Sequence, residues 1–214
     1  MEKSTSFFDK IFIGTQAMTK HNKDRYDIIL REATALFSEN GYSSTTVRQI
    51  AERTGIKSGS LFHHFSTKEE ILFIILKSAS LITSGKIKKS IEQGINCKEQ
   101  LRNTIRVLIE VVHEDEVFSA SWSVLNRDAR HLTNDHRKEF TKIYNEGIIK
   151  ALQDLLIECK KQRLVKTDPL VLTHLISDTT FFSIRWFKKG GRLDLDQLAN
   201  QIFLTVVNND EATA

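Results

Sequence analysis

The sequence predicts an all-α protein, and three observations lead to this prediction. The 214 residues contain a single proline, Pro169, and proline is the residue that a helix interior tolerates least. Apolar residues recur at three- and four-residue steps along most of the chain, which is the spacing of one helix face. No credible run alternates apolar and polar residues as a half-buried strand would. We therefore expect helices throughout the chain.

Composition indicates a cytoplasmic protein. The net charge is +4 and the isoelectric point is about 9.0, so any binding to nucleic acid depends on where the charge lies. Cys97 and Cys159 lack metal-ligand spacing, which favours buried thiols in a reducing compartment. No apolar run approaches the ~20 residues of a membrane span, and the N-terminus lacks a secretory signal pattern. We expect neither a membrane partner nor secretion.

The first regular helix is predicted from Asp24 to Asn40. It ends there because glycine accepts the left-handed conformation that closes a helix, and Gly41 follows. The apolar stripe of this helix consists of Ile28, Ile29, Ala33, Leu36 and Phe37. The helix is expected to cover the back of two shorter helices, since short helices are stable only when they pack against others.

Two short helical patterns joined by a glycine come next and form a helix-turn-helix. Thr45 or Thr46 is a suitable N-cap for the first helix, and Gly55 ends it. The buried face of this helix carries Val47, Ile50 and Ala51. The spacing therefore places the turn of the motif at Gly55.

The second short helix begins near Lys57 or Ser58 and turns Leu61 and Phe65 inward, because these two lie one helical turn apart. No Asp or Glu occurs between residues 53 and 67. The outward face of this helix is therefore locally cationic and meets phosphates without repulsion. Such a helix fits the major groove of DNA.

This region resembles the DNA-binding signature of the TetR family of bacterial repressors. A helical hairpin that merely packs would explain the apolar positions, but not the spacing of Gly55, Gly59 and Lys68. The matching positions are Thr45-Thr46, Ile50-Ala51, Gly55-Ile56, Ser58-Gly59, Leu61-Phe62, His64-Phe65, Lys68-Glu69 and Leu72. The resemblance implies a homodimer whose two recognition helices occupy successive major grooves of a pseudo-palindromic double-stranded operator.

The same resemblance implies which residues contact DNA. Three positions depart from the family pattern: Thr54 replaces a small residue, Lys57 a Ser, and Phe62 a Tyr whose hydroxyl donates to a phosphate. Phe62 has no hydroxyl, and the charge of Lys57 is expected to compensate. The expected DNA-binding residues are Thr45, Thr46, Arg48, Lys57, Ser58, Gly59, Ser60, Phe62, His63, His64 and Lys68.

Helical periodicity continues after this motif. A long helix is predicted from Lys68, capped by Ser66 or Thr67, and Asp168-Pro169 and Asp194 begin the last two helices. The second of these three helices is expected to reach Gly190-Gly191. Apolar stripes at Leu101, Ile105, Leu108 and Val112, and at Phe140, Tyr144, Ile148, Ala151, Leu155 and Cys159, add two core helices. The expected domains are a tail (1–22), the helix-turn-helix domain (23–68), a larger ligand-binding and dimerisation domain (69–208) and a C-terminal tail (209–214).

The second domain is similar, more loosely, to one branch of the same family over residues 120–205. That branch represses fatty-acid, sterol and aromatic-acid breakdown and responds to acyl-CoA thioesters. The similarity rests on the runs Leu125–Leu132 and Phe181–Leu193. Aromatic side chains suit an acyl channel, and guanidinium groups suit CoA phosphates. The expected ligand-binding residues are Trp122, Phe181 and Phe182 for the acyl part and Arg127, Arg130 and Arg185 for the phosphates.

Simpler roles remain open for these residues. An aromatic stripe at helical spacing also fits an ordinary core, and Arg185 has Trp186 and Asp178 as alternative partners. The histidines do not complete a metal-site spacing, and no nucleophile elbow or glycine-rich phosphate loop occurs. We expect no cofactor, no metal and no enzymatic activity.

The sequence thus predicts a ligand-responsive transcriptional regulator, a repressor that a small hydrophobic effector releases from its operator. One alternative is a repressor of an efflux pump that responds to lipophilic drugs. Another is a helical interaction protein that does not bind DNA. Binding that weakens steeply as salt rises would distinguish a DNA-binding protein from the second alternative.

Overall fold

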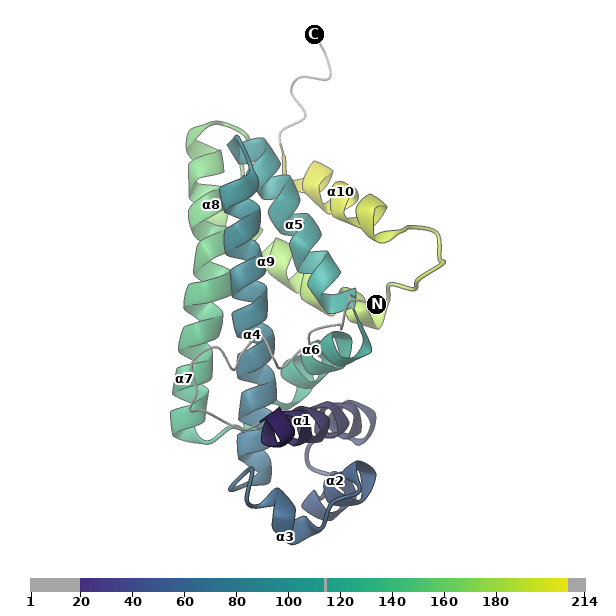
Figure 1. The fold of residues 1–214 in the computed structure, drawn as a ribbon. Coiled ribbons are helices and arrows are strands. Elements are labelled where there is room, and N and C mark those ends of the chain that lie inside the picture. Colours follow the sequence, from purple (N-terminus) through teal and green to yellow (C-terminus); the bar gives the residue numbers. More distant parts are fainter. Residues whose placement is uncertain (1–19, 114, 208–214) are drawn as a thin grey trace. The chain divides into compact units, whose positions relative to one another are not determined.

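The computed structural model describes residues 20–113 and 115–207, and within these ranges every regular element is helical (Figure 1). The all-α prediction is confirmed. None of the helices in these ranges is long and apolar enough to cross a membrane. The elements are α1 (Lys20–Asn40), α2 (Val47–Thr54), α3 (Ser58–Leu61), α4 (Lys68–Gln93), α5 (Cys97–His113), α6 (Glu116–Asp128), η1 (Ala129–His131), α7 (Asn134–Tyr144), η2 (Asn145–Ile149), α8 (Lys150–Lys161), α9 (Pro169–Phe181), η3 (Phe182–Arg185) and α10 (Leu195–Val206).

The chain forms two compact units. The first combines the residues up to Ile82 with Asp115–Thr141, and the second combines Thr83–Glu114 with the residues from Lys142 onward. The division falls inside α4, so this helix contributes to both units. The predicted boundary after residue 68 marks the end of the helix-turn-helix and stays a prediction. Most of the predicted tail 1–22 and all of the predicted C-terminal tail 209–214 lie outside the described residues.

In the first unit, α1 packs against α2 and α6. Its core positions are fully buried, but Ile28 is 47% exposed, so its place in the predicted stripe was wrong. Leu30, at 0% exposure, takes that place. The cause is geometric: 3.6 residues per turn carry Leu30 and Ala33 toward the partner helices and turn Ile28 away.

The helix-turn-helix forms as predicted. The Thr46 side chain accepts a hydrogen bond from the Gln49 amide, and the Gln49 side-chain oxygen accepts one from the Thr46 amide. This reciprocal capping box satisfies two amides that a helix start leaves unpaired. At the other end Gly55 has φ 68°, and the amide of Ile56 donates to the Ala51 carbonyl at 3.0 Å. The hinge therefore needs glycine, which adopts positive φ without strain.

In the second unit, α5 packs against α8, α9 and α10. The predicted stripe of α5 is fully buried. The helix of the Phe140 stripe is interrupted by the π-turn η2, which the sequence analysis missed. Within η2, a Cβ on Gly147 would lie 2.5 Å from Ser84 Oγ of α4. A glycine there allows the two backbones to approach closely.

Helix α9 is shorter than predicted. It starts with Asp168 as N-cap and Pro169 in its first turn, as expected, but the α-helix ends at Phe181 and continues as the 3₁₀ turn η3. The buried Ser183 hydroxyl donates to the Thr180 carbonyl at 2.6 Å. Serine and threonine side chains that bond nearby carbonyls compete with regular helix geometry, which is consistent with an early end. Helix α10 begins with the predicted capping box at Asp194.

Candidate nucleic-acid interface and effector residues

The outward face of α3 and the turn after it carries most of the predicted DNA-binding residues. Leu61 and Phe65 are buried, at 0% and 1% exposure. Phe62, between them in sequence, is 52% exposed. Lys57, Gly59 and His63 are exposed and Ser58 and Ser60 half-buried. One short helix thus presents small polar groups, a cation and an aromatic ring together.

His64 lies beside this face and differs from its neighbour His63. Burial lowers the pKa of His64, and the nearby Arg25 and His63 side chains lower it further. Its imidazole is therefore neutral at neutral pH, when it offers one donor and one acceptor. A neutral imidazole can form a hydrogen bond with a phosphate or a base edge, but it cannot form an ion pair with a phosphate.

Two predicted contacts lie at the start of α2. Thr46 is exposed, but its hydroxyl oxygen is occupied as the helix cap. Arg48 Nε lies 2.8 Å from Glu52 Oε1, and the two side chains are 83% and 60% exposed. Exposed pairs of this kind contribute little to stability, so Arg48 can exchange Glu52 for a phosphate at small cost.

Thr45 and Lys68 point inward instead. Thr45 is 1% exposed, and its hydroxyl donates to the carbonyls of Gly41 and Leu36. Lys68 Nζ donates to the carbonyls of Tyr42 and Thr45, both at 2.7 Å. Burial lowers the pKa of Lys68. Both residues therefore fasten the turn between α1 and α2, whose carbonyls have no helical partners.

Residues 53–67, which contain no acid, carry less unpaired positive charge in the structure than the sequence suggests. Arg53 Nε contacts Glu32 at 2.7 Å and Arg53 Nη1 contacts Glu39 at 2.8 Å. Both acids belong to α1, which packs against α2. A window along the sequence omits such partners from another helix, so Arg53 adds less positive charge to this surface than the sequence suggests.

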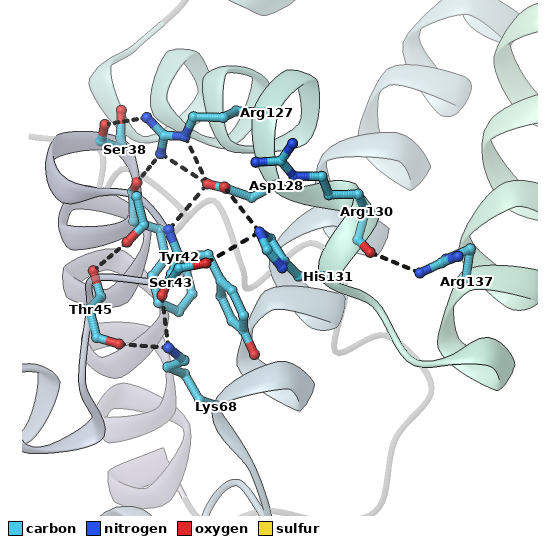
Figure 2. Close-up of polar contacts among 12 residues, drawn as sticks. Ser38, Tyr42, Ser43, Thr45, Lys68, Arg127, Asp128, Arg130, His131 and Arg137 are labelled. Atoms are coloured by element: carbon cyan, nitrogen blue, oxygen red, sulfur yellow. Dashed lines mark hydrogen bonds and ion pairs between the residues drawn. The ribbon is translucent and has the colours of Figure 1, made fainter.

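Arg127 lies in a polar network at the end of α6 (Figure 2). Its guanidinium donates to the carbonyls of Phe37 and Ser38 at the end of α1 and to Asp128. Asp128 is 3% exposed and accepts a hydrogen bond from the Tyr42 amide. Arg127, which was predicted to contact the CoA phosphates, is thus hydrogen-bonded to the end of α1 within its own unit.

The other predicted effector residues have varied surroundings. In the first unit Trp122 is fully buried and Arg130 is exposed. In the second unit Phe181 is buried at 2% and Phe182 is 36% exposed, and Arg185 stacks over Phe182 with 4.9 Å from Cζ to the ring centroid. Arg185 thus pairs with Phe182 rather than with Trp186.

Tyr144 was predicted only as a core residue, yet it lies next to Phe181. The two ring centroids are 6.3 Å apart. Burial, with the Asp178 carboxylate nearby, raises the pKa of Tyr144 to about 12, so its hydroxyl stays protonated and can donate a hydrogen bond. Helical spacing alone did not indicate that the Tyr144 hydroxyl would lie near Phe181.

A helix-turn-helix with an exposed reading face, followed along the chain by a larger helical domain, defines a class of DNA-binding regulators. A family model described as "Bacterial regulatory proteins, tetR family" matches residues 29–74, and one described as "Tetracyclin repressor-like, C-terminal domain" matches residues 94–209. The chain belongs to the TetR family of bacterial regulatory proteins. It is a transcriptional regulator and not an enzyme.

Several relatives support this assignment. The HTH-type transcriptional repressor KstR2 of Mycobacterium tuberculosis is 30% identical over 181 residues, covering 84% of this chain and 88% of the relative. Its structure, a ketosteroid transcriptional regulator, superposes with a TM-score of 0.75 at 25% identity over 90% of this chain and 97% of that one. The fatty acid metabolism regulator protein of Bacillus subtilis is 22% identical over 88% of this chain and 97% of its own length.

The regulator AibR, solved in complex with isovaleryl coenzyme A and operator DNA, has the same fold. Its TM-score is 0.77 at 24% identity, over 85% of this chain and 97% of that one. At this identity the likeness establishes the shared fold.

Proposed function

We propose that this regulator is a repressor that binds a pseudo-palindromic operator as a homodimer and is released by a small hydrophobic effector. The observation that carries the proposal is the α3 face, where Lys57, Phe62 and His63 are exposed while Leu61 and Phe65 anchor the helix from behind. Exposed side chains on a rigidly anchored helix are what groove reading requires. Repression takes place on the chromosome, which makes the protein cytoplasmic.

An apolar surface on the last helices supports the dimer. Large apolar side chains there are 36–53% exposed, and they recur along one side of α9, on η3 and on α10. They are Leu170, Val171, Leu175, Phe182, Trp186 and Leu204. Exposed apolar side chains of this size favour association, and a two-fold pairing of these helices would form a four-helix bundle. The dimer would use the segments Pro169 to Phe187 and Leu195 to Val207, which contain these side chains.

A CoA thioester is the proposed effector class. Relatives named for ketosteroid and fatty-acid regulation, and the AibR complex with isovaleryl coenzyme A, support this class. In this chain the Phe181 and Tyr144 rings lie with their centroids 6.3 Å apart and offer an aromatic wall for the acyl part. Arg130 and Arg185 are exposed and remain candidates for the phosphates, whereas the Arg127 guanidinium has four hydrogen bonds within its unit.

The test uses a duplex selected by the wild-type protein from a random-sequence library. A gel-shift titration at several salt concentrations should show specific binding that weakens steeply with salt. Short, long and ring-bearing CoA esters and their free acids are then added. Release by an ester but not by its acid supports the effector class. Failure to select any duplex would contradict the repressor itself, and release by free acids alone would contradict only the CoA class.

A further inference from the structure

Helix α6 ends in two charged residues that attach it to the end of α1. Arg127 donates to the Phe37 and Ser38 carbonyls, which belong to the last helical turn of α1, where carbonyls are available to side-chain donors. The Phe37 carbonyl also accepts from the Gly41 amide. A cation is stabilised at a helix C-terminus. The last turn of α1 has no basic residue of its own. Helix α6 therefore supplies the charge that the end of α1 lacks.

Asp128 connects the same helix to the turn that follows α1. Its Oδ2 accepts from the Tyr42 amide at 3.3 Å and from Arg127 Nε and Nη2 at 3.0 and 2.9 Å. The carboxylate is 3% exposed. A buried charge is tolerated only with compensating partners. The burial of Asp128 thus depends on Arg127 and the Tyr42 amide staying in place.

The turn at residues 41–46 is held from other sides as well. Lys68, the first residue of α4, donates to the Tyr42 and Thr45 carbonyls and lies 4.2 Å above the Tyr42 ring. The Tyr42 ring also stacks on His131 at 5.1 Å. This turn leads directly into Thr46, the cap of α2. Its position therefore sets where α2 and α3 lie relative to α6 within the unit.

We propose that Arg127 and Asp128 are positioning residues that fix the reading helix to α6, so that the dimer accepts only one spacing between operator half-sites. This inference rests on the proposed homodimeric binding to a pseudo-palindrome. One base pair added between half-sites displaces one of them by ~3.4 Å and rotates it by ~35°, since one turn takes ~10–10.5 base pairs. A rigidly held reading helix cannot follow that displacement, whereas a loosened one can.

The experiment compares spacing discrimination among variants. The duplex selected by the wild-type protein is tested with its natural spacing and with one central base pair added or removed. Arg127→Ala removes the guanidinium group that donates to the Phe37 and Ser38 carbonyls of α1. The double variant Arg127→Met with Asp128→Asn replaces the charged pair by neutral groups of similar size, so it leaves no uncompensated buried charge. Arg137→Ala is the control, because Arg137 donates to the Arg130 and Leu132 carbonyls and so braces only η1.

Wild type and Arg137→Ala are expected to lose at least ~30-fold in affinity on each altered duplex. The clamp variants, Arg127→Ala and the double variant Arg127→Met with Asp128→Asn, are expected to bind the natural duplex ~10-fold more weakly. On the altered duplexes they are expected to lose less than ~5-fold further in affinity. Full discrimination by a folded clamp variant overturns the positioning role, whatever its absolute affinity. Loss of the cooperative melt in both clamp variants also overturns it, because the pair is then a folding element. Failure of the wild type to select a duplex contradicts the proposed function instead.

Discussion

The missing hydroxyl group of Phe62 is expected to limit the affinity for DNA. The ring is 52% exposed on the face proposed to meet DNA, yet it has no hydrogen-bonding group. Phe62→Tyr should add a hydroxyl donor to a phosphate and tighten operator binding by ~1 kcal/mol, or roughly five-fold, because a net hydrogen bond contributes about that much. Weaker binding by this variant in a gel-shift titration would mean that the ring packs where no hydroxyl fits.

Two lysines that look alike in sequence should behave differently. Lys57 is exposed, so Lys57→Ala should weaken binding to all duplexes and lower the salt slope by about one, while the melting temperature stays unchanged. Lys68 braces the turn after α1, so Lys68→Ala should reduce the free energy of unfolding by ~1–3 kcal/mol. Denaturant titration of both variants checks this. An unchanged stability of Lys68→Ala would contradict the bracing role.

Sequence reasoning succeeded here where the signal was local. The capping residues Thr46 and Asp194 and the hinge Gly55 depend on neighbours within a few residues. It did not foresee partners that come from distant segments. Lys68 and Arg127 were expected to contact phosphates of DNA and of CoA, and these roles stay predictions. Nothing in the sequence indicated that Lys68 would bind turn carbonyls or that Arg127 would bind carbonyls at the end of α1.

At the scale of elements, the contact between η2 and α4 depends on the absence of a side chain. Gly147→Ala would place a methyl group 2.5 Å from Ser84 Oγ and 2.8 Å from its Cβ. Such overpacking costs ~1–3 kcal/mol, which should exceed the ~1 kcal/mol that alanine gains over glycine in a helix.

Gly85, in α4, provides the matched control, since a Cβ there meets nothing within 4 Å. Gly85→Ala should stabilise the protein by ~0.5–1 kcal/mol. Urea denaturation of both variants gives the comparison. Equal stabilisation by the two substitutions would show that η2 yields easily and that the close approach has little importance.

Helices with regular apolar stripes were predicted well, and α6 was not identified. Its buried residues include Phe118, Trp122 and Val124, but also Ser121 and Asp128. Polar groups on the inner face dilute the periodic signal. The early end of α9 was missed for a related reason, because the hydroxyl of Ser183 turns toward a carbonyl instead of leaving the backbone to continue as an α-helix.

For the whole molecule, the apolar surface of α9 and η3 should determine the oligomeric state. Trp186 and Leu175 are each 53% exposed, so Leu175→Asp with Trp186→Asp should convert the dimer to a monomer, because burying two carboxylates in a symmetric interface is prohibitive. Operator affinity should fall when the dimer is lost. Analytical ultracentrifugation of the variant measures whether its mass is that of a monomer or a dimer. Ile95→Asp is the control, since Ile95 is 89% exposed on the loop before α5; dimer loss there as well would argue against this surface.

The internal pairing of cations has a consequence for how many copies of the regulator a cell needs. Arg53 is held by acids of α1 and Lys68 by carbonyls. Binding to unmatched DNA depends almost entirely on cations that neutralise phosphates. With these two cations engaged inside the fold, random chromosomal sequence competes less strongly for the protein. A larger share of the molecules then remains available to the operator, so a small number of dimers per cell is enough to keep it occupied.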